Sequence, residues 1–273
     1  MGEYVALDVT TDAHVAHVVL RGPGKGNALG PDFWREMPAA FAALDQNRDV
    51  HAIVLSGAGG QFTYGLDLAA MRTELRYALD GNNLAAERTQ FLAQLSAMQQ
   101  ATLAMLRCDT PIVAAISGWC IGAGIDVVCA ADVRVCSSDA QFSVRAVRVG
   151  IVEDVGSLQL LPRIVGEGAA RELALTGMDV DAEYARAIRL VNHVEPTPDA
   201  ALARAHAIAA RIAANPALVV RGVKRVMNEF SHRGLTESLH YTALWNTAFM
   251  QSHDFAEALA AFRERRPPHF QGR

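Results

Sequence analysis

The first half of the chain alternates short apolar runs with longer segments in which apolar residues recur every three or four positions. The short runs are bounded by turn residues and predict buried strands, whereas the longer periodic segments predict amphipathic helices. We expect strands at 5–9, 14–20, 52–56, 112–117, 132–136 and 141–144, and helices at 31–46 and 84–107. The first two strands pair around a turn at 10–13. This alternation predicts an α/β core of stacked strand and helix units.

After residue 156 the pattern becomes helical. The expected helices are 156–164, 168–175, 181–187, 198–214, 216–230, 235–250 and 255–263, with one short strand at 191–194. We find no low-complexity linker and no clear repeat. We therefore divide the chain into an α/β core, residues 1–197, and a C-terminal helical region, residues 198–273. A chain of 273 residues with 51% hydrophobic residues is long enough to bury a large core.

The segment SGWCIGAGIDVVCAADVRV, residues 117–135, combines small residues with an apolar run that carries one acid, Asp126. Gly122, Ala123 and Gly124 allow a ligand to approach the backbone closely, and a helix beginning near Gly124 directs its free N–H groups and positive dipole end at that ligand. Such donors stabilise a carbonyl that becomes an oxyanion.

A second donor is expected from the segment AIVLSGAGGQFTYGLDL, residues 52–68. It is typical of a buried strand followed by a Gly-rich turn and a tight FxxGxDL segment, which places a backbone N–H near Leu66. Two donors from separate loops would form an oxyanion hole.

Four motifs together resemble the crotonase, or enoyl-CoA hydratase/isomerase, superfamily in order and spacing: RGPGKGNAL at 21–29, QFTYGLDL at 61–68, SGWCIGAGID at 117–126 and FRERRPPHFQG at 262–272. The resemblance covers essentially the whole chain. It implies an α/β fold built as a spiral of ββα units, with a C-terminal helical region that packs on neighbouring copies in a homotrimer or homohexamer.

The same resemblance implies that the enzyme stabilises the enolate of an acyl-CoA thioester with the backbone N–H groups of Leu66 and Ala123. Coenzyme A is then part of the substrate, and no separate cofactor is expected. The residues expected to bind the acyl-CoA are Arg21, Lys25, Gly26, Ala28, Tyr64, Asp67, Leu68, Trp119, Gly122, Arg145, Ala146 and Val149. For Lys25, simple exposure to solvent is the competing interpretation.

The acids depart from the hydratase pattern. A hydratase uses two glutamates to activate water, at the positions matching Asp126 and Ala146, so the first is shortened here and the second is missing. The Δ3,5-Δ2,4-dienoyl-CoA isomerase branch instead has aspartates matching Asp126 and Asp154, although its third acid also corresponds to Ala146. We expect Asp154 to act as the base, with Glu153, Asp126 or water completing the proton transfer.

Structural roles compete with each of these assignments. Asp154 precedes a predicted helix and could simply cap it. Asp126 could do no more than favour a helix N-terminus, while Glu153 is expected to face solvent and is kept only as an auxiliary acid. Arg145 and Arg148 belong to a solvated face, or else neutralise an acidic acyl group or pair with Asp154.

Two further classes stay open. One is another crotonase reaction, either hydration or displacement on an aryl-CoA; the dehalogenase branch that performs the latter needs a histidine on the helix before Pro111, and residues 83–107 contain none. The other is a non-catalytic RNA-binding or scaffolding role, which only Arg263, Arg265 and Arg266 support. A net charge of −4 and a pI near 6.1 disfavour nucleic acid and anionic membranes as partners.

The remaining signals bear on compartment and assembly. No secretory leader or membrane span is found, so a cytoplasmic location is expected. The four cysteines, Cys108, Cys120, Cys129 and Cys136, lack metal-site spacing and are expected to be buried thiols, with Cys120 alone near enough to the site to meet a reagent. No metal is expected. An apolar helix surface at Tyr241, Leu244, Trp245 and Phe249 indicates either a subunit interface or an internal core.

Overall fold

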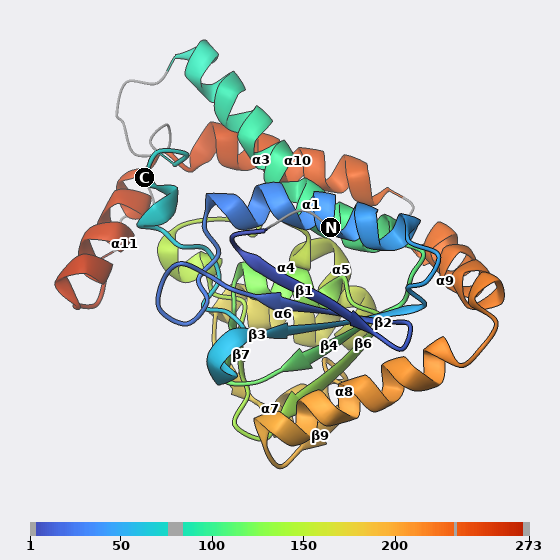
Figure 1. Ribbon diagram of the computed structural model, residues 1–273. Coiled ribbons are helices and arrows are strands. Elements are labelled where there is room, and N and C mark those ends of the chain that lie inside the picture. Colours follow the sequence, from blue (N-terminus) through green and yellow to red (C-terminus); the bar gives the residue numbers. More distant parts are fainter. Residues whose placement is uncertain (1–3, 76–83, 232–233, 270–273) are drawn as a thin grey trace.

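The computed structural model describes residues 4–75, 84–231 and 234–269. A six-stranded sheet runs through the molecule in the order β1-β2-β3-β4-β6-β9 (Figure 1). β1 pairs antiparallel with β2, and every other pair in this sheet is parallel. The strands are β1 (Leu7–Asp12), β2 (Val15–Leu20), β3 (Ala52–Gly57), β4 (Ile112–Ile116), β6 (Val133–Ser137) and β9 (His193–Glu195).

A second, three-stranded sheet has the order β5-β7-β8. It is formed by β5 (Trp119–Ile121), β7 (Gln141–Ser143) and β8 (Asp179–Asp181). β5 and β8 were not predicted: β5 lies within the Gly-rich segment 117–126, and β8 has a single apolar residue between two aspartates. The small sheet matters for the site because Gly122 follows β5 directly, and its N–H donates to the Ser143 carbonyl at 2.9 Å.

The expected helices are confirmed to within a few residues. They are α1 (Pro31–Gln46), α3 (Ala85–Arg107), α4 (Ala123–Cys129), α5 (Ser157–Val165), α6 (Glu167–Thr176), α7 (Ala182–Ala187), α8 (Pro198–Ala213), α9 (Ala217–Ser231), α10 (Leu235–Phe249) and α11 (His253–Glu264). Single 3₁₀ turns occupy η1 (Ala58–Gly60), η2 (Ala70–Arg72) and η3 (Ala146–Val149).

The N-terminal hairpin differs from the expectation in its length. β1 continues to Asp12 rather than ending at residue 9, and the turn consists of Ala13 and His14, with φ of 42° and 68°. Positive φ at both central residues gives a turn whose twist suits a β-hairpin, but Ala and His are not the residues that signal it.

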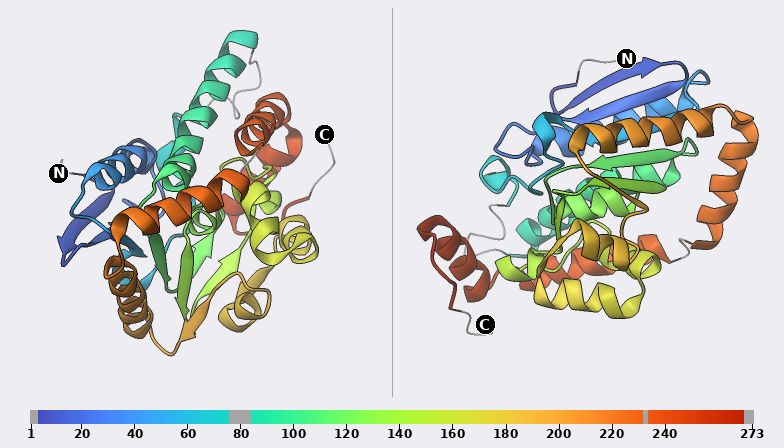
Figure 2. Two further views of the ribbon diagram at one scale, coloured as in Figure 1. Left: turned by 90° about the vertical axis from the view of Figure 1, so that its right-hand side faces the viewer. Right: turned by 90° about the horizontal axis from the view of Figure 1, so that it is seen from below.

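Helices cover both faces of the six-stranded sheet (Figure 2). On one face α8 presents Ala201, Ala205 and Ala209 to a layer of strand residues that includes Val54 and Val113. The small alanine side chains at four-residue spacing let α8 lie close to the sheet. On the other face a larger core contains side chains of α1, α3, α4 and α5. α10 packs on α3 and α5.

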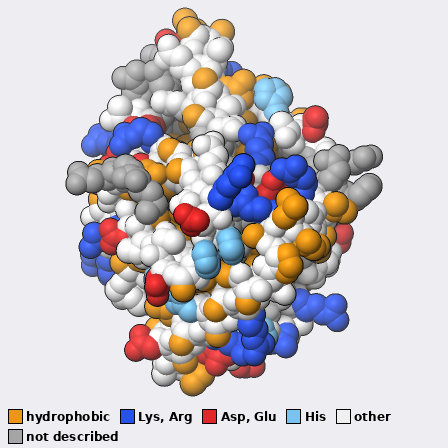
Figure 3. Space-filling view, turned by 45° about the vertical axis from the view of Figure 1, so that its right-hand side comes forward, with side chains coloured by type: hydrophobic (Ala, Val, Ile, Leu, Met, Phe, Trp, Pro, Cys, Tyr) orange, Lys and Arg blue, Asp and Glu red, His pale blue; other side chains and the backbone are white. Residues whose placement is uncertain are grey.

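α9 extends away from this body and is attached by charged groups. Lys224 is buried, and its Nζ lies 2.7 Å from Asp132 Oδ2, while Arg221 Nη1 lies 3.2 Å from Asp45 Oδ1. The outer side of the helix is apolar and exposed at Leu218, Val219, Val223, Val226 and Met227. Figure 3, which turns the α9 side of the molecule toward the viewer, shows hydrophobic side chains gathered beside charged ones.

The aromatic surface expected on α10 is only partly described. Tyr241 is 65% exposed and Leu244 is 43% exposed, whereas Leu239 and Ala243 are buried. The side chains of Trp245 and Phe249 lie outside the described residues. Among the helices that the structure describes, none is long and apolar enough to cross a bilayer.

Candidate active site

The two expected donor loops lie against each other. Gly65, with φ of 79°, approaches the segment after β5 so closely that a Cβ on it would lie 2.6 Å from the Ile121 carbonyl oxygen and 3.5 Å from the Ala123 nitrogen. Gly122, with φ of 50°, is the N-cap of α4, so Ala123 is the first residue of that helix. In the described part of the chain, the N–H groups of Leu66 and Ala123 donate no hydrogen bond. Both remain available for a ligand.

Backbone hydrogen bonds hold these loops together. Thr63 N–H donates to the Trp119 carbonyl at 2.9 Å, and Ile121 N–H donates to the Thr63 carbonyl at 3.1 Å. Leu66 is also bridged to Leu29, the last residue of the RGPGKGNAL motif. The donors therefore belong to a rigid arrangement of three loops, as electrostatic preorganisation requires.

Asp126 is fully buried on the first turn of α4. Its Oδ1 accepts a hydrogen bond of 2.5 Å from the N–H of Ser157, the first residue of α5. Its Oδ2 has no hydrogen-bond partner among the described residues. Burial raises the pKa of Asp126 to about 7, and the bond from Ser157 opposes that rise.

Asp154 lies beside Asp126 in the segment before α5. It does not cap that helix, because the N-cap is Gly156 and the carboxyl that accepts from the first residue of α5 is that of Asp126. Instead Asp154 Oδ2 accepts a hydrogen bond of 2.6 Å from Asn246 Nδ2. Burial raises its pKa to about 6, and the bond from Asn246 acts in the opposite direction. The capping interpretation of Asp154 is therefore wrong.

Asn246 and Gln99 hold the segment around Asp154, and neither was singled out from the sequence. The amide of Asn246, on α10, also bonds the carbonyl oxygen of Val152 at 2.6 Å and its N–H at 3.3 Å. Gln99 Nε2, on α3, donates to the carbonyl oxygens of Asp154 at 2.7 Å and Leu239 at 3.0 Å. Both amides interrupt the apolar face of their helix, which is the sequence signal that could have revealed them.

Glu153 does not face solvent, contrary to expectation. Its side chain is buried, and Oε1 has no hydrogen-bond partner among the described residues. Burial raises its pKa well above the usual range, and the neighbouring carboxyls of Asp126 and Asp154 raise it further. Three acids, one from α4 and two from the segment before α5, are thus grouped together, with Glu153 next to the loop that contains Gly122.

The loop expected to bind coenzyme A packs on the QFTYGLDL segment. A Cβ on Gly26 would lie 2.6 Å from the ring of Tyr64, and one on Gly24 would lie 2.5 Å from Asp67 Oδ2. Asp67 Oδ1 accepts hydrogen bonds from the backbone N–H groups of Ala69 and Ala70, at the start of η2. Lys25 is exposed in this loop. Arg21 is exposed as well and pairs with Asp8, with Nε 3.1 Å from Oδ2.

Arg145 and Arg148 are engaged elsewhere than expected. Both form ion pairs with Asp179, at 2.5 Å and 3.1 Å, so the alternative in which they pair with Asp154 is not the one found. The guanidinium of Arg145 also lies 5.2 Å from the centre of the Trp119 ring. Ala146 and Val149 lie on η3, and Ala28 and Leu68 are half-buried in the loops described above.

The four cysteines are free and buried. Burial raises the pKa of the Cys120 thiol well above its usual value, so the expectation that a reagent could reach Cys120 is contradicted. In the described ranges, no three or more His, Cys, Asp or Glu side chains are grouped so as to hold a metal ion.

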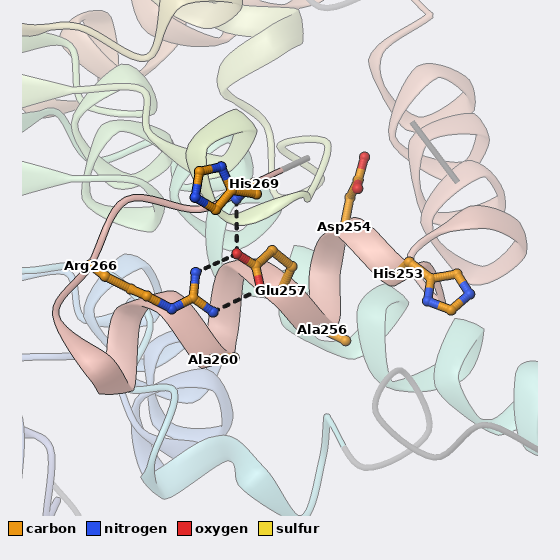
Figure 4. A pocket seen from close by; sticks show the side chains of 7 residues that line it. All are labelled: His253, Asp254, Ala256, Glu257, Ala260, Arg266 and His269. Carbon is orange, nitrogen blue, oxygen red and sulfur yellow. Dashed lines mark hydrogen bonds and ion pairs between the residues drawn. The ribbon is translucent and has the colours of Figure 1, made fainter. Parts of the chain in front are cut away.

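A separate hollow of about 550 Å³ lies at α11 and the segment after it (Figure 4). Its lining includes His253, Glu257, Arg266 and His269. The Glu257 carboxylate accepts two bonds from Arg266, of 2.5 Å and 2.9 Å, and one of 2.8 Å from the His269 N–H. None of the three buried acids lines this hollow, so we do not place the chemistry here.

Two unbonded backbone N–H groups from separate loops, with a group of buried acids near one of them, suit the stabilisation of a developing oxyanion. The comparisons agree. A model of the enoyl-CoA hydratase/isomerase family matches residues 10–273, and the chain belongs to this family.

Curated relatives and solved structures support the same assignment. The chain is 38% identical to the peroxisomal Δ(3,5)-Δ(2,4)-dienoyl-CoA isomerase of Arabidopsis thaliana, over 99% of this chain and 98% of that protein. It is 37% identical to the mitochondrial Δ(3,5)-Δ(2,4)-dienoyl-CoA isomerase of Homo sapiens, over 96% of this chain and 80% of that protein. The crystal structure of an enoyl-CoA hydratase/isomerase from Xanthobacter autotrophicus Py2 superimposes with a TM-score of 0.84 at 28% identity, over 96% of this chain and 94% of that one.

Proposed function

We propose that this enzyme is a dienoyl-CoA isomerase that moves the double bonds of a 3,5-dienoyl-CoA to the 2,4 positions during acyl-CoA degradation. The observation that carries this proposal is Asp154, a buried carboxyl held by Asn246 next to the buried carboxyls of Asp126 and Glu153. The names of the relatives at 36–38% identity support the same reaction.

The reaction needs a proton removed from C2 and a proton supplied to C6. The N–H groups of Leu66 and Ala123 would stabilise the negative charge that develops on the thioester oxygen. Asp154 would exchange one of the two protons, because a pKa near 6 lets it act in either protonation state close to neutral pH. The intermediate is a dienolate whose charge extends along the acyl chain.

Hydration is the weaker alternative. A water-activating pair would need a carboxyl at residue 146, where the chain has alanine, and Asp126 already uses one oxygen to bind the α5 backbone. Relatives named as hydratases, such as a putative enoyl-CoA hydratase of Thermus thermophilus at 32% identity, fit less well than the isomerases.

A panel of CoA thioesters tests the proposal. We expect rapid conversion of 3,5-dienoyl-CoA to the conjugated 2,4-isomer, followed by absorbance, and slow water addition to 2-enoyl-CoA. Turnover of neither substrate would contradict the proposal and would favour a more specialised crotonase reaction or a binding role.

We also propose that the chain assembles as a homotrimer or homohexamer, supported by the exposed apolar side chains of α9 and α10. Sedimentation velocity at micromolar concentration should show no monomer of 29.3 kDa. A persistent monomer would contradict it. A cytoplasmic location remains a prediction, since the relatives above are named as peroxisomal and mitochondrial enzymes.

A further inference from the structure

Glu153 is the buried group whose position the function proposed above leaves unexplained. Its side chain is 9% exposed, and its Oε1 is buried without a hydrogen-bond partner in the described residues. The three carboxyls of Asp126, Glu153 and Asp154 form no ion pair with a Lys or Arg of the described chain. A buried carboxyl without a counter-ion is destabilising, so a purely structural reason for it is missing.

The position of Glu153 relates it to the oxyanion hole. Its Oε1 lies 3.8 Å from the point where a side chain on Gly122 would begin, and Gly122 directly precedes the donor Ala123. Because Gly122 has no side chain, the space between this carboxyl and the donor loop stays open. A thioester whose oxygen binds the Ala123 N–H would place its C2, one bond beyond the carbonyl carbon, on the same side.

Glu153 also faces the position at which an acid is missing. The backbone amide of Ala146 faces the Glu153 carboxyl and lowers its pKa, although burial outweighs that effect. A glutamate placed seven residues further along the chain therefore fills the space beside residue 146. The methyl group of Ala146 leaves room for it.

We propose that Glu153 is the catalytic residue that exchanges the proton at C2, and that Asp154 exchanges the proton at C6. This inference rests on the isomerase function proposed above and deepens it. Asp154 is held on the side of α10 by Asn246, whereas Glu153 is the acid beside the oxyanion loop, so the two acids suit opposite ends of the dienoyl segment.

The proton transfers balance as follows. The Glu153 carboxylate takes the proton from C2, and the electrons of that C–H bond form the C2–C3 double bond. The C3–C4 double bond shifts to C4–C5, and the C5–C6 electrons take a proton from the Asp154 carboxylic acid. One proton then returns from Glu153 to Asp154, directly or through solvent, before the next turnover. The raised pKa values of both acids allow one of them to hold this proton near neutral pH.

Proton exchange in D₂O separates the two roles. With 3,5-octadienoyl-CoA and full-length enzyme, NMR follows loss of the C2 proton and entry of deuterium at C6. We expect Glu153→Gln to reduce both C2 exchange and isomerisation at least 100-fold. Asp154→Asn should abolish deuterium entry at C6 while the substrate still loses its C2 protons to solvent.

The matched control is Glu183→Gln, which changes an exposed glutamate on α7. This variant should keep the wild-type rates of C2 proton exchange and of isomerisation. Glutamine keeps the shape of Glu153 and removes a buried charge, so the Glu153→Gln variant should fold. If Glu153→Gln does not fold, the Glu153→Met variant is used in its place. Wild-type C2 exchange in a folded Glu153 variant would overturn the inference while leaving the isomerase function intact. A wild-type enzyme that does not isomerise the substrate would instead overturn the proposed function.

Discussion

Two carboxylate sites in this molecule differ in what surrounds them. At α11 the Glu257 carboxylate accepts bonds from Arg266 and from the His269 N–H, and these hold its pKa at about 2. In the cluster of Asp126, Glu153 and Asp154, burial dominates and raises the pKa of every member. The Glu257 carboxylate at α11 is fixed as an anion by its partners, whereas burial favours the protonated form of each carboxyl in the cluster.

We interpret the difference as one between a structural ion pair at α11 and a cluster suited to proton transfer. The α11 hollow is an opening of about 550 Å³, yet its acid is already paired with an arginine. Of the three buried acids, Glu153 lies beside the Gly122 loop, next to the unused Ala123 N–H. Perturbed pKa values near unused backbone donors, rather than the size of a hollow, are our reason for proposing the reacting centre at this cluster.

The largest expected effect comes from Asp154→Asn. The amide keeps the shape of the side chain and an oxygen for Asn246, but it cannot exchange a proton, so isomerisation should fall about 10²- to 10⁴-fold with thioester binding unchanged. Steady-state kinetics and calorimetric titration with a CoA thioester measure the two quantities. Glu257→Gln, which removes the paired carboxylate at α11, should keep its turnover; equal losses in both variants would break the distinction between the sites.

Ala123→Pro should reduce turnover about 10²- to 10³-fold, since it removes one oxyanion donor. Ala123 is the first residue of α4, where proline fits a helix and removes only an N–H that the described chain leaves unused. Ala85→Pro, at the first position of α3, is the matched control and should keep full activity. An unchanged kcat for Ala123→Pro would refute the oxyanion assignment.

Asn246→Ala should have a smaller effect, about tenfold on kcat with little change in KM, because Asn246 positions Asp154 rather than touching substrate. Its hydrogen bond lowers the pKa of Asp154, so removing it should move the corresponding limb of the pH–rate profile to higher pH. Asn246→Asp is not a suitable control, since it adds a charge. A drop in rate with an unmoved profile would indicate a general structural role instead.

A separate effect is expected on stability. The pKa of Asp154 rises from 3.8 to about 6 on folding, so its contribution to stability is full below about pH 4 and is lost as the pH rises through about 6. Asp154→Asn should therefore gain stability relative to wild type between pH 4 and pH 7.5, by up to about 3 kcal/mol. Chemical denaturation at several pH values measures it, and a difference independent of pH would contradict the shift.

Much of the fold was predictable because its signals are local. The runs that form β3 and β4 and the periodic segments of α1 and α8 show their period within a few residues, and the motifs around Leu66 and Ala123 show where two loops must approach a ligand. β5 and β8 were missed because neither shows a local strand pattern and each depends on pairing with β7.

The acid cluster was only partly predictable. Asp126 and Asp154 were found by their resemblance to known positions, but the burial of Glu153 depends on how η3, the Gly122 loop and α5 pack together. Likewise, nothing local links Asn246 to Asp154, 92 residues earlier. The partner of Arg145 was left open, because Asp179 belongs to a strand that the sequence pattern did not reveal.

The most direct test of the central claim measures isomerisation of 3,5-dienoyl-CoA and hydration of 2-enoyl-CoA on one preparation, for wild type, Asp154→Asn and Asp126→Asn. We predict fast isomerisation and slow hydration in wild type, near-complete loss of isomerisation in Asp154→Asn, and a weaker loss in Asp126→Asn. Fast hydration that survives Asp154→Asn but not Asp126→Asn would contradict the isomerase assignment and identify an atypical hydratase.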